Sequence, residues 1–134
     1  MDLSKIHFLA VLVASLSAFV IGFLWYSPAF LGKIWMKEAC LTEEKVRHSN
    51  MVKIFSLSFL LTLIICFNLA AFLGTDAGFL WGMIYGGLAG IGWVAASLGV
   101  LFLFEGRTLK LFLIDGGYQA ITYMVAGAII GAWQ

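Results

Sequence analysis

The sequence predicts an all-α polytopic membrane protein with four transmembrane helices and a short interfacial helix between the first two. The 134 residues are 63% hydrophobic and 11% charged, whereas soluble domains carry about 25% charged residues. Four apolar runs, each about 20 residues or longer, match the length that crosses a bilayer core of roughly 30 Å. In hydrocarbon the backbone must hydrogen-bond to itself, so these runs are helices. The runs cover residues 6–26, 54–73, 79–104 and 111–133 of a single membrane domain, residues 1–134.

The first span ends at a sequence that is typical of a helix start. Ser27 is a good N-cap, and Pro28 suits the first helical position because its missing N–H costs nothing there. A short helix is therefore expected from Pro28, lying in the membrane surface with its lysines toward the headgroups. Six residues of this region form an interface motif: Trp25, Tyr26, Ser27, Pro28, Lys33 and Trp35. The motif fits an aromatic belt beside a helix stop, or a shelf for a headgroup or ligand.

The second span belongs to a longer predicted helix. Thr42 is the expected N-cap, and Glu43 and Glu44 suit the positive end of the helix dipole. No helix breaker was recognised after them, so one helix is predicted over residues 43–73. Residues 27–53 then form a cytoplasmic segment, part interfacial helix and part extension of this second helix. Within the span, Cys66 is interpreted as a packing residue, and Asn68 can bond across helices.

Glycines spaced four residues apart mark the third and fourth spans. Such stripes let two helix backbones approach closely in lipid, although they can also line a cavity. The stripes comprise Gly82, Gly86 and Gly90 in the third span, and Gly127 and Gly131 in the fourth. The short connection over residues 105–108 predicts an antiparallel hairpin. Trp93, near the middle of the third span, is expected to pack over small residues or to form the wall of an apolar pocket.

The fourth span carries the one polar stripe that the sequence places inside a helix. Four residues spaced i, i+3, i+4 and i+7 share a helical face: Asp115, Tyr118, Gln119 and Thr122. A charge within a span is costly, which suggests a ligand or ion site anchored by Asp115. The alternative is a snorkelled or ion-paired residue at the membrane interface, since Asp115 lies close to a basic segment. The basic residues within reach are Lys110, Arg107 and Lys33.

The basic residues also predict an orientation. Seven of the eight lysine and arginine side chains lie in the first and third gaps, and Lys5 is the other. Positively charged loops stay in the cytoplasm, so these two gaps are expected there, with both termini outside.

Three hypotheses for function follow. A net charge of +1 without a basic stripe argues against nucleic acid as a partner. The first hypothesis is a homo-oligomer that self-associates through glycine-bearing helices and binds membrane lipid or a small apolar ligand. The second is a small ion- or proton-coupled transporter or channel that uses Asp115. The third is a lipid-modifying enzyme whose residues would be Arg47, Arg107, His48 and Tyr26. It ranks last, because the sequence offers no catalytic set and no metal or cofactor motif.

Residues 24–28 (LWYSP) and 32–36 (GKIWM) carry a family resemblance. With them, the chain resembles the small bacterial four-span membrane proteins grouped as domain of unknown function 1761. The resemblance extends over the turn at residues 104–107, Tyr118 and the final helix to Trp133, while Leu31 stands where phenylalanine is common. It implies the four-span architecture and a bacterial inner (plasma) membrane location. It implies no activity.

Overall fold

A computed structural model describes residues 2–134 as a set of helices without strands. Four long helical stretches are α1 (Phe8–Trp25), α4 (Met51–Leu73), the continuous stretch Gly78–Glu105, and α7 (Leu109–Trp133). The third stretch consists of α5 (Gly78–Ala89), η2 (Gly90–Ala95) and α6 (Ala96–Glu105). Short helices are η1 (Leu3–Lys5), α2 (Gly32–Glu38) and α3 (Glu43–Arg47). All four long stretches are long and apolar enough to cross a membrane, which confirms the predicted fold class.

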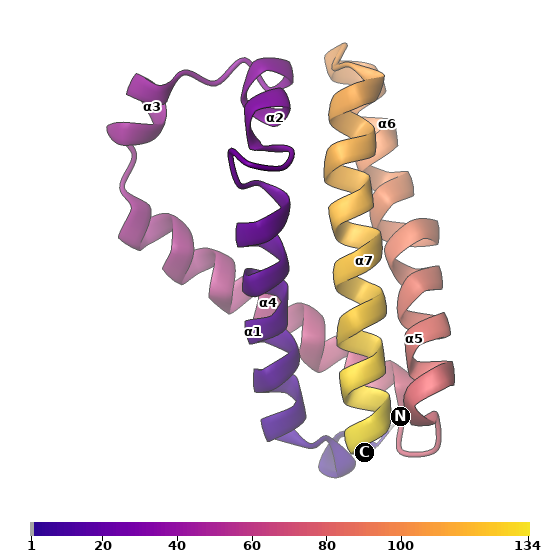
Figure 1. Cartoon of the computed structure of the whole chain (residues 1–134). Helices are drawn as coiled ribbons and strands as arrows, with labels where there is room; N and C mark the ends of the chain where they lie inside the picture. The colour runs from indigo at the N-terminus through magenta and orange to yellow at the C-terminus, as the bar shows by residue number, and fades with distance from the viewer. Residues whose placement is uncertain (1) are drawn as a thin grey trace.

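The helix α7 lies in the middle of the molecule (Figure 1). It runs between α1 on one side and the α5–α6 stretch on the other. The helix α4 crosses behind them obliquely, so that its first residues lie near α3 and far from the start of α7. Both ends of the described chain lie at one end of the molecule, opposite α2, α3 and the α6–α7 turn.

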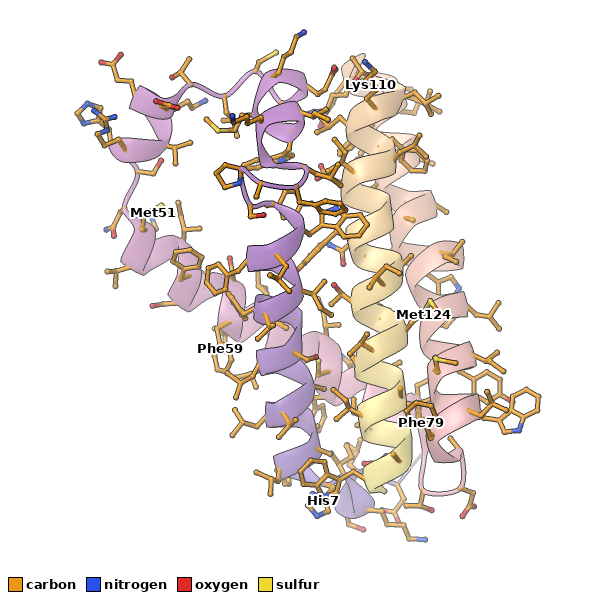
Figure 2. The ribbon with its side chains drawn as sticks, in the orientation of Figure 1. His7, Met51, Phe59, Phe79, Lys110 and Met124 are labelled. Carbon is orange, nitrogen blue, oxygen red and sulfur yellow. The ribbon has the colours of Figure 1, made fainter. Side chains whose placement is uncertain are left out.

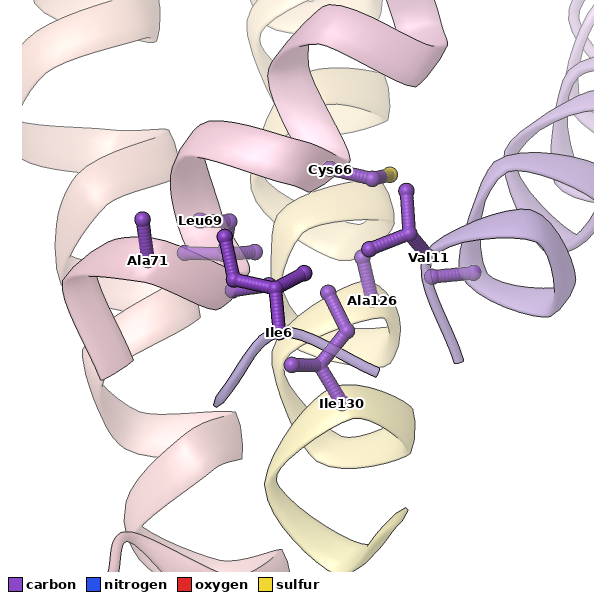
Figure 3. Packing of buried hydrophobic residues seen from close by; sticks show 9 residues of the cluster. Ile6, Val11, Cys66, Leu69, Ala71, Ala126 and Ile130 are labelled. Carbon is purple, nitrogen blue, oxygen red and sulfur yellow. The ribbon is translucent and has the colours of Figure 1, made fainter. Parts of the chain in front are cut away.

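The buried core sits at the end of the molecule that holds the chain termini. Figure 3 shows Cys66 and Leu69 of α4 facing Val11 of α1 and Ala126 and Ile130 of α7. The side-chain amide of Gln134 reinforces this end, because its Nε2 donates to the carbonyls of Ala70 and Gly74 at 3.0 and 2.8 Å. The core therefore joins the last turns of α4 to α1 and α7.

The glycine stripes join α5 to α7 within one chain. A Cβ placed on Gly82 would overlap the carbonyl oxygen of Gly127, and one on Gly86 would overlap that of Tyr123. A Cβ on Gly131 would overlap the carbonyl oxygen of Gly78. Backbone meets backbone along this interface, so no side chain fits between the helices. Because the stripes are occupied inside the chain, they are not free for a second copy, and self-association stays a prediction that needs another surface.

The second predicted helix is wrong in one respect, because it is broken between α3 and α4. Residues 48–50 interrupt it, and Asn50 caps a new helix by accepting from the backbone N–H of Lys53 at 3.1 Å. Asparagine at this position is a strong helix start, and this signal was overlooked in the polar segment. The predicted cap at Thr42 is confirmed, since its Oγ1 accepts from the N–H of Lys45.

The start of the interfacial helix is also corrected. Ser27 does not cap it, because its hydroxyl donates backward to the carbonyl of Leu24 at 2.8 Å. Residues 26–31 form turns instead, and α2 begins at Gly32. A Cβ at Gly32 would overlap the carbonyl oxygens of Tyr26 and Ser27, so glycine permits the chain to fold tightly at this point.

An irregular segment in the third span was not predicted. The six residues of η2 form a π-helical turn, in which backbone hydrogen bonds join residues five apart. Trp93 lies in this segment and is 63% exposed, with its ring edge-on to Phe72 of α4 at 5.6 Å between centroids. The expectation that Trp93 packs over small residues is therefore wrong. Trp93 instead lines a pocket, as the alternative predicted.

Candidate functional site

The polar stripe of α7 meets the interface motif at the end of α1. The hydroxyl of Tyr26 donates to Oδ1 of Asp115 at 2.6 Å, across 89 residues of sequence. The hydroxyl of Tyr118, one turn further along α7, donates to the carbonyl of Ala18 in α1 at 3.0 Å. Two regions that the sequence singled out separately thus form one cluster.

Trp25 fixes the position of this cluster. Its indole Nε1–H donates to the carbonyl of Ile114 at 2.9 Å, and its ring lies against the open side of Gly117. Phe30 packs edge-on to the same indole at 5.5 Å. Trp25 therefore holds the end of α1 on α7 and sets the register in which Tyr26 reaches Asp115.

Aromatic rings surround the phenol of Tyr26. The ring of Trp35, which α2 brings back over the end of α1, lies 5.0 Å away in an edge-on arrangement. The ring of Tyr118 lies 5.3 Å away on the stripe of α7. The tight turn at Gly32 permits this arrangement, because it returns α2 toward α1.

Asp115 makes no salt bridge within residues 2–134. In this part of the chain the one ion pair joins Arg107 to Glu105, with the Arg107 guanidinium also near the ring of Phe102. Lys33 and Lys110 are exposed at the same end of the molecule. The ion-paired form of the interface alternative is therefore wrong, and the snorkelled form stays a prediction. The carboxylate of Asp115 instead accepts from a phenol, and the residue is partly buried.

The stripe continues along the face of α7 that points toward α4. Asp115, Gln119 and Tyr123 are four residues apart, and Ala126 and Ile130 continue the same face. Ala126 and Ile130 are buried against α4 in the core cluster. The first half of α4 diverges toward α3 and away from the start of α7 (Figure 1), and Asp115 and Gln119 are partly buried.

A cavity of about 330 Å³ lies between the second half of α4 and η2. Tyr123 lines it from α7, Trp93 and Val94 from η2, and Asn68 and Phe72 from α4. Trp93, Asn68 and Phe72 are exposed, so this cavity opens on the surface that the spans present to lipid. We use the name α4–α7 recess for these five residues together with Gln119 and Asp115, which lie about one and two turns before Tyr123 on the same face of α7 and do not line the cavity themselves.

Other predicted site residues lie apart from the recess. Thr122 is buried, and its hydroxyl has no hydrogen-bond partner in the described chain. Pro28 is exposed in the turn before α2. The four residues of the enzyme hypothesis are not gathered, because Figure 1 places α3, with Arg47, on the far side of α2 from the turn that holds Arg107. Residues 2–134 contain no group of three metal-ligating side chains.

Sequence reasoning missed Tyr123, Asn68 and Phe72 as lining residues. Asn68 was expected to bond across helices, but its Nδ2 donates to the carbonyl of Ile64 in its own helix. The spacing of Tyr123 from Asp115 by two steps of four was a usable signal for the stripe's extension. The sequence did not predict the position of α4. Apolar side chains lie on all sides of its first half, so no one face of the helix is marked as the contact face (Figure 2).

The family model for "Protein of unknown function (DUF1761)" matches residues 9–131 of the chain. No curated protein and no solved structure matches it.

Proposed function

We propose that this chain, which belongs to the DUF1761 family, is an integral membrane protein that binds an amphipathic molecule drawn from the bilayer into the α4–α7 recess. The observation that carries the proposal is the position of the polar stripe. It lies on the face of α7 that points toward α4, where the first half of α4 diverges from the start of α7, and Tyr123 on this face lines a cavity with an exposed rim. Hydrocarbon offers no partners to a carboxylate or an amide, so an occupant with a polar end satisfies these groups better than acyl chains.

The shape of the cavity supports an occupant with an apolar part. Its walls are formed mainly by Phe72, Trp93, Val94 and neighbouring aliphatic side chains, with Asn68 and Tyr123 as the polar members. Ligand sites are commonly apolar cavities of about 300–1,000 Å³ with a few polar groups that fix orientation. The recess fits this description at the lower end of the range.

We also propose that the Asp115 end of the recess lies in the cytoplasmic half of the membrane. The basic residues around α2, α3 and the α6–α7 turn favour a cytoplasmic position for that end, and Asp115 lies near it. Cys40, exposed between α2 and α3, reports on this orientation. In intact cells a membrane-impermeant maleimide should leave Cys40 unlabelled and should label Thr75→Cys in a Cys40→Ser background. Labelling of Cys40 from outside would reverse the orientation.

A variant that fills the cavity tests the proposed function. The probes are three amphiphiles that share a decyl chain: neutral decanol, decyltrimethylammonium and decyl sulfate. At least one should bind saturably to the protein in nanodiscs, as measured by native mass spectrometry against empty nanodiscs. Val94→Phe should weaken that binding about tenfold, because the larger ring occupies space that the chain would fill.

Val100→Phe is the matched control. Val100 is exposed on α6 and lies outside the cavity, so the same substitution there should leave binding unchanged. The proposal fails if no probe binds saturably, or if the two phenylalanine variants weaken binding equally.

Proton- or ion-coupled transport through Asp115 is a second candidate, and one observation favours it. The carboxylate has no basic partner in the described chain and keeps accessible surface inside a span. In proteoliposomes, Asp115→Asn should abolish any proton-coupled flux while Tyr26 retains an oxygen acceptor. Undiminished flux in this variant would remove Asp115 from the transport mechanism.

A further inference from the structure

We infer that the occupant of the α4–α7 recess is an amphipathic organic cation whose charged head lies beside Asp115 and the ring of Tyr26. This inference rests on the proposed function and specifies the chemistry of its ligand. It draws on three observations: a carboxylate without a salt-bridge partner, aromatic rings packed on the tyrosine that donates to it, and an apolar cavity further along the same face of α7.

The charge of the recess is set by Asp115. The nearby Arg107 is neutralised by Glu105, and the other basic side chains of this end, including Lys33 and Lys110, are exposed and form no salt bridge with Asp115. The Tyr26 hydroxyl bonds only Oδ1 in the described contacts, and a single neutral donor does not balance a carboxylate in a low-dielectric setting. A cationic head supplies the missing charge.

The rings select an organic cation over a metal ion. Tyr26 has Trp35 on one side at 5.0 Å and Tyr118 on another at 5.3 Å between ring centroids. Alkylated ammonium groups are attracted to the faces of tyrosine and tryptophan rings. A hard metal cation needs several oxygen ligands, and residues 2–134 hold no cluster of acidic and histidine side chains that would supply them.

The cavity accounts for an apolar tail. Asp115 and Tyr123 are separated by eight residues of α7, which corresponds to roughly 12 Å along the helix axis. The cavity at Tyr123 has Phe72, Trp93 and Val94 in its walls. A ligand with its head at Asp115 therefore extends a chain along Gln119 and places its end between α4 and η2.

The order of affinities of the three decyl probes tests the inference. Decyltrimethylammonium should bind more tightly than decanol, and decyl sulfate most weakly, in nanodiscs of uncharged phosphatidylcholine. Asp115→Asn keeps the oxygen that accepts from Tyr26 but removes the charge. This variant should bind decyltrimethylammonium about tenfold more weakly than the parent protein does, and its affinity for decanol should be unchanged. Asp76→Asn, in the exposed loop before α5, is the control and should alter neither of these two affinities.

Each outcome decides between the inference and the proposed function. Equal affinities for the three probes, a preference for decyl sulfate, or an unchanged affinity of Asp115→Asn for the cation would overturn the inference and leave the proposed function standing. Absence of saturable binding by all three would remove both. If Asp115→Asn does not fold, Trp35→Leu provides the test. This variant should have a lower affinity for decyltrimethylammonium and an unchanged affinity for decanol. Trp81→Leu is its control and should change neither affinity.

Discussion

Two faces of α7 show opposite solutions to helix packing in a membrane. Toward α5, glycines bring the backbones into direct contact, and an added methyl at Gly82 or Gly127 would overlap a carbonyl oxygen of the opposing helix. Toward α4, the same helix presents Asp115, Gln119 and Tyr123, and the first half of α4 diverges from the start of α7. One face leaves no room for any molecule, and the other leaves a cavity of about 330 Å³.

The face of α7 toward α5 contributes to stability, and the face toward α4 leaves space for another molecule. Small residues allow close van der Waals contact, which is the main attraction between helices when lipid is as apolar as the side chains. Polar residues on an uncovered face contribute no such contact and are costly in hydrocarbon. Their position is explained by an occupant rather than by the packing of the chain itself.

The largest effect is expected from filling the packed face. Gly127→Leu should destabilise the protein by about 3 kcal/mol or more, because its side chain would meet the backbone of Gly82 and no flexible group can yield. Thermal unfolding can be followed by the exposure of buried Cys66 to a thiol-reactive dye in a Cys40→Ser background. Gly92→Leu, where a Cβ meets nothing within 4 Å, should retain the parent melting temperature or exceed it.

A smaller effect is expected from the contact that holds α1 on α7 above the recess. Trp25→Phe keeps an aromatic ring but loses the hydrogen bond to the Ile114 carbonyl, which should cost about 1 kcal/mol. Trp81→Phe, at an exposed position of α5, should change stability less. If Trp25→Phe and Trp81→Phe lower the melting temperature equally in the thiol-exposure assay, the indole N–H contributes nothing to the position of α1.

The smallest effect is expected at the exposed end of the molecule. Glu105→Gln breaks the ion pair with Arg107, and both side chains are about half exposed, so the loss should stay below about 1 kcal/mol. The same assay should give a melting temperature close to that of the parent protein, and added salt should narrow the difference further. A loss as large as that of Gly127→Leu would mean that the α6–α7 turn contributes far more than its exposure implies.

Much of this architecture follows from local signals in the sequence. Run lengths gave the four spans, Thr42 gave a helix start, and the glycine spacing of four identified the residues that meet between α5 and α7. These features depend on residues close together in the chain. The break at Asn50 was equally local and was missed because the polar segment around it was treated as one helix.

The recess depends on contacts that the sequence does not encode locally. The meeting of Tyr26 with Asp115 joins residues 89 positions apart, and it requires the register that Trp25 sets against Ile114. The direction of α4 is harder still to predict from the sequence, because apolar side chains point to different sides of its first half, among them Val52, Ile54 and Leu57. Such a helix has no preferred face in lipid, so its tilt follows from tertiary contacts.

The direction of α4 relative to α7 tests the central claim most directly. Both helices begin at the same end, and Figure 2 shows Met51 and Lys110, near their starts, well apart. Electron-electron distance measurements in nanodiscs would compare nitroxides at Met51 and Lys110 with nitroxides at Phe72 and Ala132, near the helix ends. The account predicts a clearly longer distance for the first pair than for the second. Equal distances, as expected for helices packed along their length about 8–10 Å apart, would close the recess and contradict it.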